Sequence, residues 1–118
     1  MSKKFGVWIN TQKAVIAEII DKDTCRIVDH VKAEHGGGNS NENSAHNLEK
    51  SLQHKFFKEV CKDMQNATSI HITGTGNIQE QFAHYLKETP QFKHAEISDS
   101  TSNPMSDEAL VRFFLDKA

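Results

Sequence analysis

FGVWINTQKAVIAEIIDKDTCRIVDHVK, residues 5–32, is the stretch of sequence that decides the fold. Apolar residues alternate with other residues over 5–9, form a nearly continuous run over 14–20, and alternate with polar residues over 24–32. A period of two is typical of β-strands, and a strand that is apolar on both faces belongs inside a sheet. The stretch therefore predicts three antiparallel strands joined by tight turns, with the more polar third strand at an edge.

The period of the pattern changes after residue 47. Apolar residues then recur at every fourth position, at Leu48, Leu52, Phe56, Val60 and Met64. Such spacing places the apolar side chains on one face of a helix. It predicts an amphipathic helix of about four turns that packs against the sheet.

Strands and helices alternate in the rest of the chain. We expect a short strand over 69–73, a helix that starts near Asn77 and ends at Pro90, and a strand over 95–98. A polar loop over 99–105 then leads to Ser106, a good N-cap for a final helix. This order predicts an α/β, ribonuclease-H-like fold, a five-stranded mixed sheet with three helices, in which the fourth strand is parallel to the first.

Length and charge limit the classes of function. The 118 residues predict one domain, 1–118, with a net charge of -2. Residues 1–65 hold ten Lys/Arg against nine Asp/Glu, and residues 66–118 hold four against seven. This lack of a basic excess weighs against a general RNA-binding protein, and any RNA contact must be local. No apolar run reaches the roughly 18 residues of a membrane span, and no signal peptide is evident. We therefore expect a cytoplasmic protein with no membrane partner and with reduced cysteines.

A polar, glycine-rich segment follows the third predicted strand. Residues 35–46 read HGGGNSNENSAH and contain no large apolar side chain. Such a segment cannot bury enough surface to offset its ordering entropy, and loops of this length are usually functional or disordered. The sequence predicts a flexible loop at about 35–47.

Three lysines lie on one face of the helix that follows this loop. Lys55, Lys58 and Lys62 are spaced three and four residues apart. They form either a basic stripe that binds phosphates or a solvated face on which Glu59 pairs with Lys55. The sequence leaves both interpretations open.

Common catalytic patterns are missing. A ribonuclease-H active site needs carboxylates that converge on metal ions, yet neither 5–9 nor 69–73 contains Asp or Glu. The turn at 73–76, TGTG, lacks the other residues of a dinucleotide-binding or P-loop motif, so we interpret it as a tight turn that needs positive φ. Asn77 and Glu80 after it resemble a capping box at the start of a helix. The histidine spacing matches no zinc site, and no G-x-S-x-G elbow is present. We expect no catalytic residue, no metal and no cofactor.

Three segments together resemble a known domain. EHGGGN at 34–39, LQHKFFKEV at 52–60 and SIHITGTG at 69–76 look like the middle domain of eukaryotic and archaeal class I peptide chain release factors and their relative Pelota. In release factors a strand leads into a His-Gly-x-Gly-Gly-Gln loop and then a basic helix. The resemblance implies a stand-alone version of that domain, which has a ribonuclease-H-like fold and works on the ribosome.

The loop departs from the release-factor motif. The motif's glutamine, which helps water attack the peptidyl-tRNA ester, is replaced by Asn39, whose amide is one methylene shorter. The resemblance therefore implies a non-catalytic, translation-associated factor, as in Pelota, which lacks the glutamine motif. Its contacts with the ribosome or tRNA would come from the loop and the helix, through His35, Gly36, Gly37, Gly38, Asn39, Lys55, Lys58 and Lys62. A protein-interaction module whose loop orders on a partner, and an ester hydrolase that uses Asn39, are the alternatives.

Overall fold

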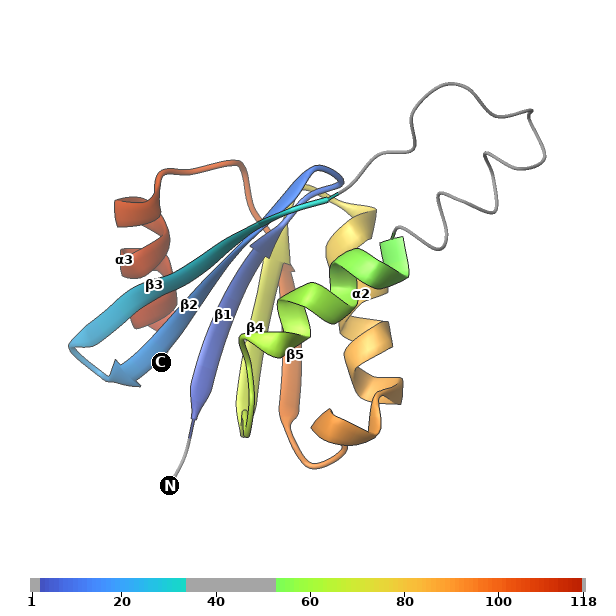
Figure 1. Cartoon of the computed structure of the whole chain (residues 1–118). Coiled ribbons are helices and arrows are strands. Elements are labelled where there is room, and N and C mark those ends of the chain that lie inside the picture. Colours follow the sequence, from blue (N-terminus) through green and yellow to red (C-terminus); the bar gives the residue numbers. More distant parts are fainter. Residues whose placement is uncertain (1–2, 34–52, 118) are drawn as a thin grey trace.

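The computed structural model describes residues 3–33 and 53–117. Its strands are β1 (Lys4–Ile9), β2 (Lys13–Asp21), β3 (Thr24–Lys32), β4 (Ser69–Gly74) and β5 (Glu96–Thr101). Residues 53–62 are helical, and they are followed along the chain by α2 (Asn77–Glu88), the short 3-10 helix η1 (Pro90–Phe92) and α3 (Asp107–Lys117). Figure 1 shows the five strands side by side with the helices packed around them.

The five strands form one mixed sheet in the order β3-β2-β1-β4-β5. β2 pairs antiparallel with both β1 and β3, whereas β4 pairs parallel with both β1 and β5. A helical crossover returns the chain to the sheet in the parallel sense, which explains the direction of β4. The predicted α/β class, the five-stranded mixed sheet with three helices, and the parallel relation of the first and fourth strands are confirmed.

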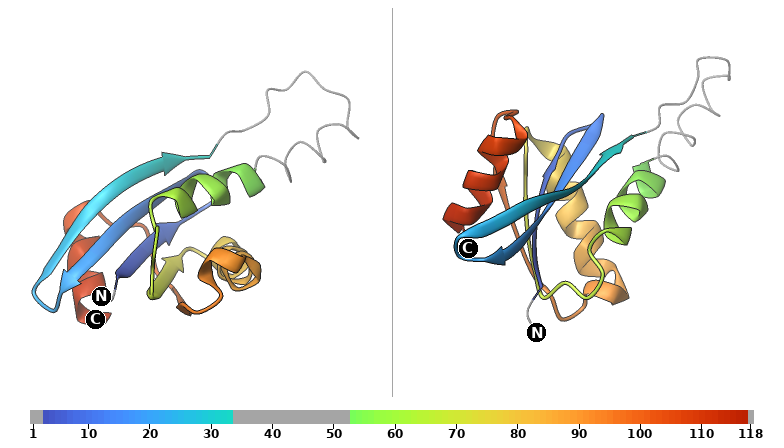
Figure 2. Two further views of the ribbon diagram at one scale, coloured as in Figure 1. Left: turned by 60° about the horizontal axis from the view of Figure 1, so that its bottom comes forward. Right: turned by 60° about the vertical axis from the view of Figure 1, so that its left-hand side comes forward.

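Helices cover both faces of the sheet. Figure 2 shows α3 on one side of the sheet, with helix 53–62 and α2 on the other. Successive side chains of a strand point to opposite faces. Accordingly, Phe5, Val7 and Ile9 of β1 belong to the core under helix 53–62 and α2, while Trp8 belongs to a second core with Leu110 and Phe114 of α3.

A glycine in β1 lets α3 approach the sheet. A Cβ atom built on Gly6 would clash with the ring of Phe114. Phe114 is fully buried, so the ring occupies the space that a larger residue at position 6 would need. The close packing of α3 on β1 therefore depends on Gly6.

The structure corrects the expected end of the fifth strand. The expected strand 95–98 and polar loop 99–105 become a strand β5 that extends to Thr101. Ser100 and Thr101 pair with Thr73 and Gly74 of β4, which supplies their backbone with hydrogen-bonding partners. Because these residues are polar and have no strand-like hydrophobic pattern, only the neighbouring strand reveals them as part of the sheet.

The N-terminus of α2 also differs from the expectation. The helix is capped at Gly76 rather than Asn77, and the Gly76 backbone N–H donates to Oε1 of Gln79 at 2.8 Å. Gln79 therefore takes the role that the sequence suggested for Glu80. The N-cap of α3 is as expected, because the backbone N–H of Ala109 donates to Oγ of Ser106 at 3.3 Å.

The first predicted helix is confirmed only within the residues that the structure describes. Phe56, Phe57 and Val60 face the core, as the four-residue spacing predicts, and Met64 is fully buried just beyond the last helical residue. Leu48 and Leu52 lie outside the described residues. None of the helices in residues 3–33 and 53–117 has the length and apolar character that a membrane crossing requires.

Candidate nucleic-acid interface

Helix 53–62 separates a buried face from a basic face. Phe56, Phe57 and Val60 lie on the buried side, whereas the predicted residues Lys55, Lys58 and Lys62 are all exposed on the outward side. The apolar stripe fixes the rotation of the helix about its axis, because it has to pack on the sheet. The structure therefore brings the three lysines together on one solvent-facing surface, which we call the lysine stripe.

Carboxylates border one end of the lysine stripe. Nζ of Lys62 lies 3.0 Å from Oε1 of Glu59, an ion pair at i, i+3 on the helix surface. Burial, a hydrogen bond that the protonated carboxyl donates to Asp29, and the negative charges of Asp29 and Glu59 together raise the pKa of Asp63 to about 6. The positive potential of the stripe is therefore partly offset near Lys62.

The predicted loop residues lie outside the described part of the chain. These residues are His35, Gly36, Gly37, Gly38 and Asn39, within the loop expected at about 35–47. The described chain on either side is informative, because the end of β3 and the start of helix 53–62 lie at the same end of the molecule in all three views (Figures 1 and 2). The two described ends of the chain that flank residues 34–52 therefore lie near the end of the helix where the lysine stripe begins.

The turn at residues 73–76 has a structural role. None of the described glycines has a positive φ, so the expectation that this turn needs one is wrong. Gly74 is required for another reason, since a Cβ atom there would collide with the carbonyl oxygen of Ile9 in β1. The buried Gln79 side chain closes the turn, because its Nε2 donates to Oγ1 of Thr101 at 3.0 Å while its Oε1 accepts from Gly76.

A group of polar side chains on β4 and β5 was not predicted. The two ring nitrogens of His71 lie 2.8 Å from Oγ of Ser98 and 2.9 Å from Oγ of Ser100. The Oγ1 of Thr73 lies 3.1 Å from Oγ of Ser100 and 2.7 Å from Oγ of Ser102. The register of the parallel pair brings these residues together, and the sequence could have indicated it only if β5 had been predicted at its full length.

The described residues form no metal cluster, and both cysteines are unreactive. Within residues 3–33 and 53–117, no three His, Cys, Asp or Glu side chains are arranged to hold a metal ion. Burial raises the pKa of Cys61 to about 12 and also raises that of Cys25, so both thiols are protonated and weakly nucleophilic at neutral pH.

Comparison with known proteins gives a match at the level of the fold. No protein-family model matches the chain, and no curated protein matches its sequence. Among solved structures, Pelota of Thermoplasma acidophilum superposes with a TM-score of 0.61 at 17% identity, covering 99% of this chain and 32% of that protein. An archaeal translation termination factor superposes with a TM-score of 0.61 at 10% identity, covering 98% of this chain and 35% of that protein.

A second Pelota agrees with the first. Pelota of Archaeoglobus fulgidus gives a TM-score of 0.59 at 19% identity, over 98% of this chain and 32% of that protein. The chain thus spans about a third of the length of the solved structures that it matches. The resemblance to Pelota and to release factors that the sequence indicated is confirmed for the fold.

Proposed function

We propose that this chain is a non-catalytic, translation-associated module that contacts ribosomal RNA or tRNA and works in the cytoplasm. The fold supports a role in translation, because it is shared with a domain-sized part of an archaeal translation termination factor and of two Pelota proteins. The lysine stripe supports the contact with RNA. We also propose that residues 1–118 form a single module.

The observation that carries this proposal is the outward orientation of Lys55, Lys58 and Lys62. Three ammonium groups on one exposed helix face can each approach a phosphate as a point charge. The glycine-rich residues 35–39 precede this helix in the sequence, so we assign them to the same contact surface. A short stripe on a chain with a net charge of -2 suits a local contact rather than coating of RNA.

We propose a non-catalytic role because residues that hydrolysis would need are missing from β1, β4 and the loop motif. The described strands β1 and β4 contain no carboxylate, which argues against metal-dependent nuclease chemistry. Asn39 stands where the release-factor motif has glutamine, and its shorter side chain would not reach the same position. We therefore propose docking without ester hydrolysis.

Co-sedimentation with ribosomes tests the proposal. Tagged protein is loaded with purified ribosomes on a sucrose gradient at 50 mM and 200 mM salt. We expect the wild type to sediment with ribosomes at low salt, and the variant Lys55→Ala/Lys58→Ala/Lys62→Ala to remain at the top. Because each phosphate contact releases counterions, binding should weaken steeply at the higher salt.

A matched variant separates a local contact from net charge. Lys22→Ala/Lys87→Ala/Lys93→Ala removes the same charge from exposed positions away from helix 53–62, so it should sediment as the wild type does. Equal loss in both triple variants would show that only the total charge matters. Wild-type protein that never leaves the top of the gradient at low salt would refute the proposal.

A further inference from the structure

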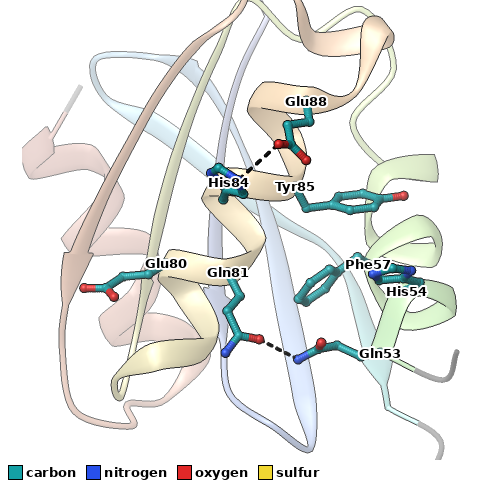
Figure 3. Close-up of a pocket in the computed structure, with 8 residues that line it drawn as sticks. All are labelled: Gln53, His54, Phe57, Glu80, Gln81, His84, Tyr85 and Glu88. Atoms are coloured by element: carbon teal, nitrogen blue, oxygen red, sulfur yellow. Dashed lines mark hydrogen bonds and ion pairs between the residues drawn. The ribbon is translucent and has the colours of Figure 1, made fainter. Parts of the chain in front are cut away.

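A pocket of about 390 Å³ lies between helix 53–62 and α2. Figure 3 shows its lining, which comes from both helices, with Phe57 and Tyr85 between two polar ends. At one end Nε2 of Gln53 donates to Oε1 of Gln81 at 2.8 Å, and this bond joins the two helices. The volume falls within the range of about 300–1,000 Å³ that is usual for ligand sites. We call this site the interhelical pocket.

Carboxylates supply the charge of the interhelical pocket. Glu80, His84 and Glu88 are spaced four residues apart, so they follow one another along one side of α2. Nε2 of His84 lies 3.1 Å from Oε1 of Glu88 at the second polar end. Among the residues that the structure describes, the lining contains Glu80 and Glu88 but no lysine or arginine, so the pocket favours cations over phosphates.

Aromatic rings form the middle of the interhelical pocket. The ring of Tyr85 lies 5.3 Å from the buried ring of Phe57 and 6.0 Å from the ring of His54, measured between centroids. Burial raises the pKa of Tyr85, so its hydroxyl group stays protonated at neutral pH. The Tyr85 ring is half-buried, and it also lies nearly parallel to the buried ring of Phe82, with the centroids 6.4 Å apart. The part of the ring that stays accessible can contact a cation, and guanidinium groups make such contacts most often.

We propose that the interhelical pocket binds an arginine side chain from a basic segment of a partner protein. The guanidinium group would stack on Tyr85 and pair with Glu88, while a second cationic residue of the same segment would pair with Glu80. Glu80 and Glu88 are eight positions apart in α2, which corresponds to a rise of about 12 Å along the helix. Two residues placed four apart in an extended peptide span about 13 Å, which matches this separation.

Helix 53–62 contributes residues both to the interhelical pocket and to the lysine stripe, and the two surfaces would bind groups of opposite charge. His54 and Phe57 face the pocket, whereas Lys55, Lys58 and Lys62 project from the outward side. RNA phosphates would therefore bind the stripe, and a basic peptide would bind the pocket. The inference goes beyond the proposed RNA contact and does not depend on it.

A peptide titration followed by NMR tests the proposal. The probe is an uncharged-ended peptide with two arginines four residues apart and Gly/Ser between them, added to ¹⁵N-labelled full chain. We expect amide shifts to change around Gln81 and Tyr85. The variant Glu80→Gln/Glu88→Gln should bind about tenfold more weakly, the sum of two exposed ion pairs of about 0.7 kcal/mol each.

Three controls make the outcome decisive. The same peptide with citrulline keeps the shape but loses the charge, so it should not bind. Glu96→Gln/Asp116→Asn removes two exposed charges elsewhere and should bind as the wild type does. The lysine stripe triple variant should also keep peptide binding, whatever its effect on ribosomes.

Specific results would overturn the assignment. Equal binding of the citrulline peptide would show that the pocket does not recognise cations. An unchanged affinity in Glu80→Gln/Glu88→Gln, with the fold confirmed by the same spectra, would place the peptide elsewhere. A lysine peptide that binds as tightly as the arginine peptide would contradict stacking on Tyr85.

Discussion

The two faces of the sheet are built differently. Among residues 3–33 and 53–117, seventeen buried residues form one core under helix 53–62 and α2, whereas six form the core under α3. On the α3 face the polar side chains of His71, Ser98 and Ser100 continue across β4 and β5. The face under helix 53–62 and α2 therefore holds the domain together, while the other face carries a single helix, α3, that depends on a few contacts.

Trp8 belongs to the smaller core, the one under α3. Its side chain is 2% exposed, and within the described residues its Nε1 has no hydrogen-bond partner. A buried donor without a partner costs about 1–3 kcal/mol. The α3 face therefore contains a local cost that the larger core does not, consistent with a less stable attachment of α3.

The largest predicted effect comes from the core under the two helices. Phe82 is fully buried, and its ring lies 4.9 Å from that of Phe57. We expect Phe82→Ala to lower the free energy of unfolding by about 3–5 kcal/mol, because it leaves a cavity in the main core. Urea unfolding followed by circular dichroism measures this loss.

A phenylalanine on the other face provides the control. Phe113 of α3 is only half-buried, so we expect Phe113→Ala to cost less than half as much. Losses of equal size from the two faces would break the comparison.

Gly6→Ala tests the attachment of α3 directly. The new methyl group would meet the ring of Phe114, so α3 must shift, at a cost of about 1–3 kcal/mol. Because Trp8 shares the core with α3, its fluorescence should shift to the red as that core loosens. Gly76→Ala serves as control, since a Cβ atom there meets nothing within 4 Å.

A smaller effect is expected for the link between β3 and α3. Nε2 of His30 lies 2.8 Å from Oδ2 of Asp107, and both side chains are about half exposed. We expect His30→Ala to cost at most about 1 kcal/mol and to speed amide hydrogen exchange in the first turn of α3. Unchanged exchange in that turn would mean that packing alone holds α3.

The smallest effect concerns Asp63 beside the larger core. Its pKa is raised to about 6, above the unfolded value, so the folded state binds more protons between about pH 4 and pH 6. Stability should therefore fall slightly as the pH rises through this range. Asp63→Asn should flatten that part of the stability profile, measured by thermal unfolding at several pH values, and an unchanged profile would show that Asp63 titrates normally.

The sequence determined the elements whose pattern is local. The alternation over 5–9 and 24–32 and the nearly continuous apolar run over 14–20 predicted the three antiparallel strands. β3 has the predicted bounds of 24–32. The four-residue spacing fixed which side of helix 53–62 is buried, and therefore that Lys55, Lys58 and Lys62 face solvent. Such patterns are readable because each depends on residues within one element.

The tertiary structure decided what depends on partners distant in the chain. β5 extends to Thr101 because β4 offers its backbone groups, and Gly6 and Gly74 are needed because Phe114 and a β1 carbonyl lie against them. The interhelical pocket arises only when two helices separated in sequence pack side by side. Sequence spacing determines the face of an element, but the surface that meets this face is set by the packing of the whole chain.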